Sequence, residues 1–102
     1  YGSDKLMNTI GACQYNSLRM AAIAMENNKE VSTEALRSGL RGLTFDGAPQ
    51  GTTTMRAEDH QAVLPSYLAK VRDGWKTPGE MFEIVVALEA VKPVPARCDL
   101  PL

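Results

Sequence analysis

Apolar and small residues recur at intervals of three and four near the start of the chain. The recurring positions are Gly11, Tyr15, Leu18, Ala22 and Met25. This spacing is that of one helix face, and it predicts a helix over residues 9–27. Ala12, Ile23 and Ala24 widen the apolar face beyond a narrow stripe. A helix that is apolar over so much of its circumference is expected to be buried on more than one side.

The ends of this helix carry their own signals. Asn8 or Thr9 can cap the N-terminus, because a short polar side chain accepts hydrogen bonds from the first free amides. Asn27 and Asn28 are the expected stops, since Asn tolerates the left-handed backbone conformation that ends many helices.

A second helix is predicted over residues 33–41. Ser32 is a good N-cap, and Val31 before it has the spacing of a hydrophobic staple with Leu36. Gly42 then stands where a left-handed residue is expected after the last turn.

The helical spacing gives way to strand-like segments after the second helix. Residues 44–45 and 52–54 favour extended backbone, and the segment 46–51 between them is rich in turn-forming residues. Turn chemistry on this scale predicts a tight crossover rather than a third helix.

Two further strands are predicted near the end of the chain. Residues 67–72 alternate as a half-buried strand does, and residues 82–89 give the clearest alternation in the sequence. They are expected to form a hairpin around the loop 73–79, with an extended tail after it. Two helices and three short strands make a small core, so the missing partner surface is expected to belong to an absent part of the same chain.

Composition narrows the class of protein without naming a function. The chain has 102 residues, of which 23% are charged, and its net charge is -1. It is one domain at most, and it has no global basic field, so a nucleic-acid partner held by phosphate contacts is not expected. No run of about 18 apolar residues or basic-then-apolar leader is present in the sequence.

The two cysteines are Cys13 and Cys98, and the only histidine is His60. This set does not have the spacing of a zinc site, and there is no C-x-x-C pair. Two interpretations stay open from these residues: two buried thiols, or one disulfide that closes most of the chain.

Other residues could have a catalytic or binding role, but a structural role explains each of them more simply. His60 follows Glu58 and Asp59 and could act as a general base, but a turn histidine that bonds the backbone is the favoured interpretation. Gly47 and Gly51 flank a turn that lacks the strand–glycine–helix order of a phosphate loop, so a hinge or crossover is expected. Tyr15 lies on the apolar stripe and is assigned to the core.

Several runs together resemble a known family. The runs are residues 12–22, 33–43, 44–51 and 59–61, followed by 67–71 with 82–85. In this order they are similar to the late segments of periplasmic solute-binding proteins of the branched-chain amino acid and amide type. Residues 73–79 are longer than the corresponding loop in many members, and the resemblance does not account for Trp75 within them.

The resemblance implies an α/β fold, in which this chain is the C-terminal part of a bilobed type I periplasmic-binding protein. Residues 1–43 would be two helices packed on one lobe, and residues 44–56 a hinge crossover and short strand. Residues 57–91 would be the closing strands and hairpin of the other lobe, and residues 92–102 an extended tail. Asp46, Gly47 and Gly51 would form the hinge.

The resemblance also implies a function. The expected role is capture of a small-molecule solute by the extracytoplasmic substrate-binding component of an ABC importer, through closure of two lobes. The expected partners are the solute, the remainder of the same receptor chain and the membrane permease, in a periplasmic location. No cofactor, metal, catalytic residue or nucleic acid is expected, and none of the family's ligand contacts transfers to a position here.

A periplasmic location permits a Cys13–Cys98 disulfide, which the resemblance therefore favours slightly. Two other functions stay open: a ligand-binding sensor domain of a receptor or regulator with the same fold, and a small free-standing enzyme or interaction module. The ligand could be an amino acid, an amide, urea or an aromatic acid.

Overall fold

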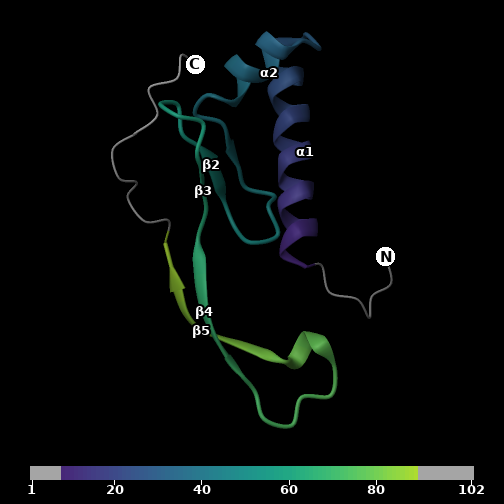
Figure 1. Ribbon diagram of the computed structural model, residues 1–102, viewed down its shortest axis with the longest axis vertical. Coiled ribbons are helices and arrows are strands. Elements are labelled where there is room, and N and C mark those ends of the chain that lie inside the picture. The colour runs from purple at the N-terminus through teal and green to yellow at the C-terminus, as the bar shows by residue number, and fades with distance from the viewer. Residues whose placement is uncertain (1–7, 90–102) are drawn as a thin grey trace.

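A computed structural model describes residues 8–89 of the chain (Figure 1). Two helices come first, α1 (Thr9–Asn28) and α2 (Thr33–Leu40). Short strands follow, and they are β1 (Thr44–Phe45), β2 (Thr53–Met55), β3 (Ala62–Val63), β4 (Ser66–Val71) and β5 (Phe82–Leu88), with a 3-10 turn, η1 (Pro78–Glu80), before the last. The expected order of two helices and then short strands ending in a hairpin is confirmed. The predicted tail, 92–102, lies outside the described residues.

Both helices begin where the sequence predicts. The Asn8 side chain accepts a hydrogen bond of 2.8 Å from the Gly11 amide, and the Ser32 hydroxyl accepts one of 3.1 Å from the Ala35 amide. Gly42 has a φ of 71° after α2, as expected for a left-handed residue. The staple is wrong, because Val31 is 87% exposed.

The end of α1 differs from the prediction. Lys29, with a φ of 53°, takes the left-handed conformation expected of Asn27 or Asn28. The Asn28 side chain instead donates hydrogen bonds to the carbonyl oxygens of Ala24, at 2.9 Å, and Ala35, at 2.8 Å. One amide group thus ties the end of α1 to α2, a role that the local sequence does not reveal.

The two helices approach closely at Gly39. A β-carbon placed on Gly39 would lie 2.6 Å from the carbonyl oxygen of Ala24 and 2.8 Å from its β-carbon. Any side chain there would push α2 away from α1, so the absence of a side chain sets the distance between the helices.

Three strands form a small antiparallel sheet beside α1, in the order β1-β2-β3 (Figure 1). The core cluster consists of Met20, Phe45 and Ala48. Partly buried side chains pack around it, namely Ile23, Leu40, Leu43 and Met55. The sequence did not indicate β3, a two-residue strand that depends on pairing with β2 rather than on a pattern of its own.

The apolar stripe predicted for α1 does not face this core. The buried residues of α1 are Asn16, Met20 and Ala24. At about 100° per residue, that set lies roughly half a turn around the helix from the predicted stripe. Leu18, in the middle of the predicted stripe, is 70% exposed. Helix α1 therefore has one side on the described core. On the predicted stripe Leu18 is open, whereas Gly11, Ala22 and Met25 are partly buried.

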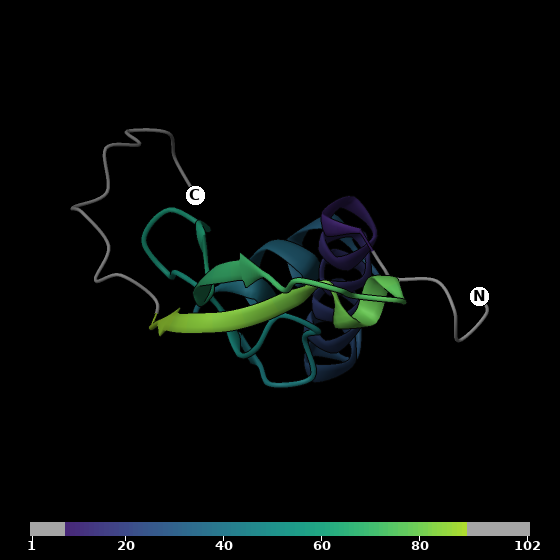
Figure 2. The same ribbon diagram turned by 90° about the horizontal axis from the view of Figure 1, so that it is seen from below.

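Strands β4 and β5 pair separately as an antiparallel hairpin that projects away from the helices (Figure 1). Seen from below, the hairpin lies in front of the helices (Figure 2). The pairing matches the prediction, but the expected half-burial of β4 is wrong, since every residue of both strands is exposed. The register shifts between Leu68 and Ala69, so that Leu68 pairs with Val86 and Ala69 with Ile84. Val85 is left unpaired at this β-bulge.

Replacing Gly39 with Ala is expected to destabilise the α1–α2 pair by about 1–3 kcal/mol, because the added methyl overlaps Ala24. Hydrogen exchange of the α2 amides measures this local stability and should become roughly tenfold faster or more. Gly79→Ala is the matched control, since a β-carbon there meets nothing within 4 Å. Equal exchange rates in α2 for the two variants would show that the close approach at Gly39 is not needed.

Candidate functional site

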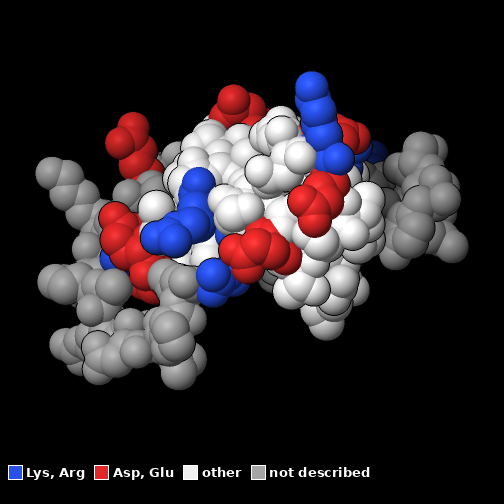
Figure 3. Space-filling model, turned by 90° about the horizontal axis from the view of Figure 1, so that it is seen from above, with Lys and Arg blue, Asp and Glu red and all other residues white. Residues whose placement is uncertain are grey.

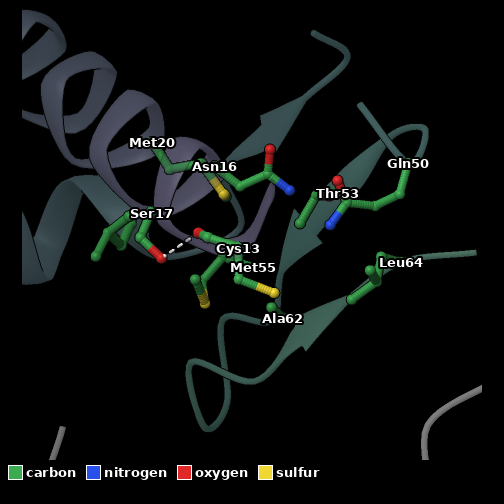
Figure 4. A pocket seen from close by; sticks show the side chains of 10 residues that line it. Cys13, Asn16, Ser17, Met20, Gln50, Thr53, Met55, Ala62 and Leu64 are labelled. Carbon is green, nitrogen blue, oxygen red and sulfur yellow. Dashed lines mark hydrogen bonds between the residues drawn. The ribbon is translucent and has the colours of Figure 1, made fainter. Parts of the chain in front are cut away.

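A pocket of about 280 Å³ lies between α1 and the β2–β3 strands (Figure 4). Helix α1 contributes one wall, and β2 and β3 contribute the other. The residues that line it are Cys13, Asn16, Ser17, Met20, Leu40, Gln50, Thr53, Met55, Ala62 and Leu64. None of these side chains is charged, so the pocket is an apolar cavity with a few neutral polar groups.

Two amide side chains are the distinctive polar groups of this pocket. Asn16 is 7% exposed, and neither its Oδ1 nor the Oε1 of Gln50 has a hydrogen-bond partner although both atoms are buried. In Figure 4 the two side chains extend toward each other from α1 and from the loop before β2, with Thr53 between them. Buried amide oxygens without partners cost free energy, so this end of the pocket is under-satisfied.

The two hydroxyls in the pocket wall are already satisfied. Thr53 donates a hydrogen bond of 3.4 Å from its Oγ1 to the carbonyl oxygen of Gly51. Ser17 donates a hydrogen bond of 2.9 Å from its Oγ to the carbonyl oxygen of Cys13, one helical turn earlier. The hydrogen-bonding capacity that stays free for an occupant is therefore concentrated on the two amides.

The predicted hinge residues form a compact turn next to this pocket. Asp46 accepts a hydrogen bond of 3.0 Å at Oδ1 from the Thr52 hydroxyl, which closes the loop across its base. Gly51 has a φ of 102°, and a β-carbon there would lie 2.8 Å from Pro65 Cγ. Glycine is thus required at Gly51 by both conformation and space. The hinge assignment for Asp46, Gly47 and Gly51 stays a prediction.

The same loop holds the base of the β4–β5 hairpin. Tyr67, near the start of β4, donates a hydrogen bond of 2.7 Å from its hydroxyl to the carbonyl oxygen of Gln50. The hairpin and the loop 46–51 are therefore fixed to each other at one point, which the sequence did not indicate because the partners are 17 residues apart.

His60 occupies a turn, as the favoured interpretation held. Its backbone φ is 54°, and its Nε2 lies 3.2 Å from the carbonyl oxygen of Arg37 at the end of α2. The neighbouring carboxylates of Asp59 and Glu58 lie 3.3 and 3.7 Å from Nε of Arg56 and pair with that guanidinium instead. The arrangement ties a loop to a helix and does not orient His60 as a general base.

The cysteines are not brought together within the described residues. Cys13 is exposed on α1 at the pocket, and Cys98 lies outside the described part, so the disulfide stays a prediction. Between residues 8 and 89, no group of three or more His, Cys, Asp or Glu side chains could hold a metal ion.

Tyr15 and Trp75 lie at the surface and do not share a site. Tyr15 is 40% exposed, and its ring packs on Phe45 with a centroid separation of 6.3 Å, so it only partly fulfils the predicted core role. Trp75 is exposed in the loop between β4 and β5. Acidic and basic side chains are interspersed on the face shown in Figure 3.

Comparison with known families decides the relationship. The family model described as periplasmic binding protein matches residues 1–76. The chain belongs to this family. The match takes in both helices, the small sheet and β4, and it confirms the resemblance seen in the sequence. The general role of periplasmic binding proteins is to bind a small solute, and family membership supports this role for the chain.

A search of curated proteins found no match. In the part that the structure describes, no helix is long and apolar enough to cross a membrane.

Replacing Tyr67 with Phe is expected to loosen the hairpin from the loop 46–51 by about 0.5–1.5 kcal/mol, because it removes one hydrogen bond and little else. Hydrogen exchange of amides in β4 and in residues 46–51 measures the effect. Tyr15→Phe is the control, since it removes the same oxygen from a partly exposed ring on α1. If the two variants exchange alike at these amides, the bond does not fix the hairpin.

Proposed function

We propose that the chain is the C-terminal portion of the substrate-binding component of an ABC importer, and that it takes part in capturing a small solute between two lobes. Family membership supports the solute-binding role. The observation that carries the rest is the apolar surface that the described residues leave open on the β4–β5 hairpin and on α1.

The hairpin is the stronger part of this observation. Its exposed apolar side chains include Leu68, Val71, Phe82, Ile84, Val85, Val86 and Leu88. A two-stranded hairpin is at best marginally stable in water by itself, and each such side chain gains about 1.5–3 kcal/mol on full burial. A neighbouring layer that covers the hairpin accounts for both its sequence and its projection from the helices.

The open side of α1 points to the same conclusion. Ile10 and Leu18 are largely exposed there, on a helix whose opposite side already packs on the core cluster. We assign residues 8–43 to the surface of one lobe, with the remainder of the receptor chain supplying the sheet beneath it. The hairpin would then join the other lobe.

The loop 46–51 lies between these two parts and would carry the hinge. It leads from β1, which packs on α1, to the Gln50 carbonyl that holds Tyr67 of the hairpin. The β1–β2 pairing holds the two ends of this loop together, so a change of backbone angles at Asp46, Gly47 and Gly51 would move the hairpin through the bond from Tyr67 to Gln50. Solute that contacts both lobes would favour the closed state through its extra contacts.

An importer of this kind works outside the cytoplasm and delivers its solute to a membrane permease. We therefore place the protein in the periplasm, with the permease as its protein partner. Stimulation of the permease's ATPase by the loaded receptor distinguishes import from a sensor function, because a sensor domain of the same fold would leave ATP hydrolysis unchanged.

Replacing Ile84 with Lys tests whether the hairpin is covered. In the complete receptor polypeptide, the variant is expected to lose about 2 kcal/mol or more of stability, because a charged side chain replaces a buried apolar one. Thermal or urea unfolding measures the loss. Val31→Lys is the matched control at a solitary exposed position and should change stability by less than about 0.5 kcal/mol. Equal stability of the two variants would contradict the proposal.

Solute binding by the complete receptor is expected to raise its melting temperature and to reduce its radius of gyration. At a concentration 100 times Kd, a ligand stabilises the folded state by about 2.7 kcal/mol. A thermal-shift screen of amino acids, amides, urea and aromatic acids finds the solute, and small-angle X-ray scattering then measures closure. A solute that raises the melting temperature without compaction would argue against closure of two lobes.

A further inference from the structure

We infer that the pocket between α1 and β2–β3 is a second ligand site, which takes a small neutral molecule with an apolar body and a primary amide group. The site differs from that of the proposed interlobe capture, because every residue that carries the inference lines one pocket beside α1 and none belongs to the β4–β5 hairpin. It rests on the size of the pocket, the absence of charge in its lining and the two under-satisfied amides at one end.

The size and lining set the body of the ligand. A volume of about 280 Å³ is close to the lower end of the range for small-molecule pockets, roughly 300–1,000 Å³. Met20, Leu40 and Met55 supply apolar walls. Methionine side chains adapt to an occupant's shape, so a flat ring or a branched aliphatic group of about that size fits.

The charge of the lining sets the charge of the ligand. The ten lining side chains include no Lys, Arg, Asp, Glu or His. A carboxylate or an ammonium group would lose its hydration here without meeting a counterion, which costs several kcal/mol. A neutral ligand is therefore favoured over either ion.

Asn16 and Gln50 set the polar group. Each side chain is an amide with one carbonyl oxygen and one NH₂ group, and in each the oxygen is buried without a partner. Rotation of either amide about its last bond exchanges the two ends, so each can offer the pocket a donor or an acceptor. A primary amide carries both complements in one planar group and can satisfy the two side chains at once.

Neither amide is occupied by the surrounding protein through its oxygen. Asn16 stands on the side of α1 that faces the core, four residues before Met20, where an apolar side chain would pack without this cost. An unsatisfied polar group at such a position is expected where an occupant completes its hydrogen bonds.

Benzamide is the probe, and acetophenone and benzoate are its matched analogues. Acetophenone replaces the NH₂ group by a methyl group of similar size, and benzoate replaces the neutral group by an anion. In the complete polypeptide we expect benzamide to bind about tenfold more tightly than acetophenone, which corresponds to about 1.4 kcal/mol and is within the contribution of one well-formed hydrogen bond. Benzoate is expected to bind more weakly than both.

Cys13 reports where the probe binds. It lines the pocket and is exposed, so benzamide should slow its reaction with N-ethylmaleimide. The background is Cys98→Ser, with any cysteine outside these 102 residues also replaced by Ser, so that Cys13 is the thiol that reacts. This readout does not depend on transport or on closure of lobes, and scattering should show no compaction with benzamide. If the solute screen fails, protection of Cys13 by benzamide still tests the pocket. If benzamide does not protect Cys13, the solute screen still tests interlobe capture.

Two variants and one control locate the polar contact. Asn16→Leu and Gln50→Met should each remove the preference for benzamide over acetophenone, and Gln50→Met lies in a loop where the fold is less at risk. Gln14→Leu removes the same amide from an exposed position of α1 outside the pocket and should keep the preference.

Three outcomes would overturn the inference. Equal binding of benzamide and acetophenone would show that the amides do not read the ligand, and no protection of Cys13 would place any binding elsewhere. Slow reaction of Cys13 before benzamide is added would mean that the rest of the receptor chain already fills the pocket.

Discussion

The contact between Phe45 and α1 holds the helical layer to the strands. Phe45 lies on β1 and packs with Met20 and Ala48, while its ring also contacts Tyr15. Few side chains share this task, because the core cluster has three members and is surrounded by four partly buried ones. So small a cluster can fix the position of one helix against one sheet, but it cannot also cover the second side of α1 or any part of the hairpin. The open apolar surfaces thus follow from the size of the core, and the proposed remainder of the receptor chain would cover them.

The two polar features next to the core differ in how they are used. The NH₂ group of Asn28 donates hydrogen bonds to two backbone carbonyl oxygens and so joins the two helices. Asn16 is more enclosed than Asn28 on the same helix, and its oxygen has no such partner. The same residue type therefore serves structure at one end of α1 and leaves unused hydrogen-bonding capacity further along it. This contrast is the physical basis for separating the α1–α2 junction from the pocket.

The sequence predicted those elements whose signals are local. Ser32 and Gly42 mark the ends of α2 by cap chemistry, and the alternation over residues 82–89 predicts β5, because in each case a few neighbouring residues determine the conformation. The runs shared with periplasmic binding proteins were also sufficient to indicate the family.

Local sequence patterns could not predict the features that depend on contacts between distant residues. The strong stripe through Leu18 indicated a helix correctly, but it could not show which side of that helix meets the described core. The exposure of β4, the short β3 strand and the bond from Tyr67 to Gln50 also depend on contacts between remote segments. A signal for Asn16 did exist, since it stands in step with Met20 and Ala24 at intervals of four, and a polar residue in such a row marks a site worth inspecting.

The β-bulge in the hairpin constrains any structure that covers the hairpin. An extra residue at Val85 strengthens the local right-handed coiling of the ribbon and reverses the order in which side chains point to its two surfaces. Apolar groups consequently emerge on both surfaces along its length. A neighbour on one side could cover only one of them, so full burial of the ribbon requires structure against both of its surfaces.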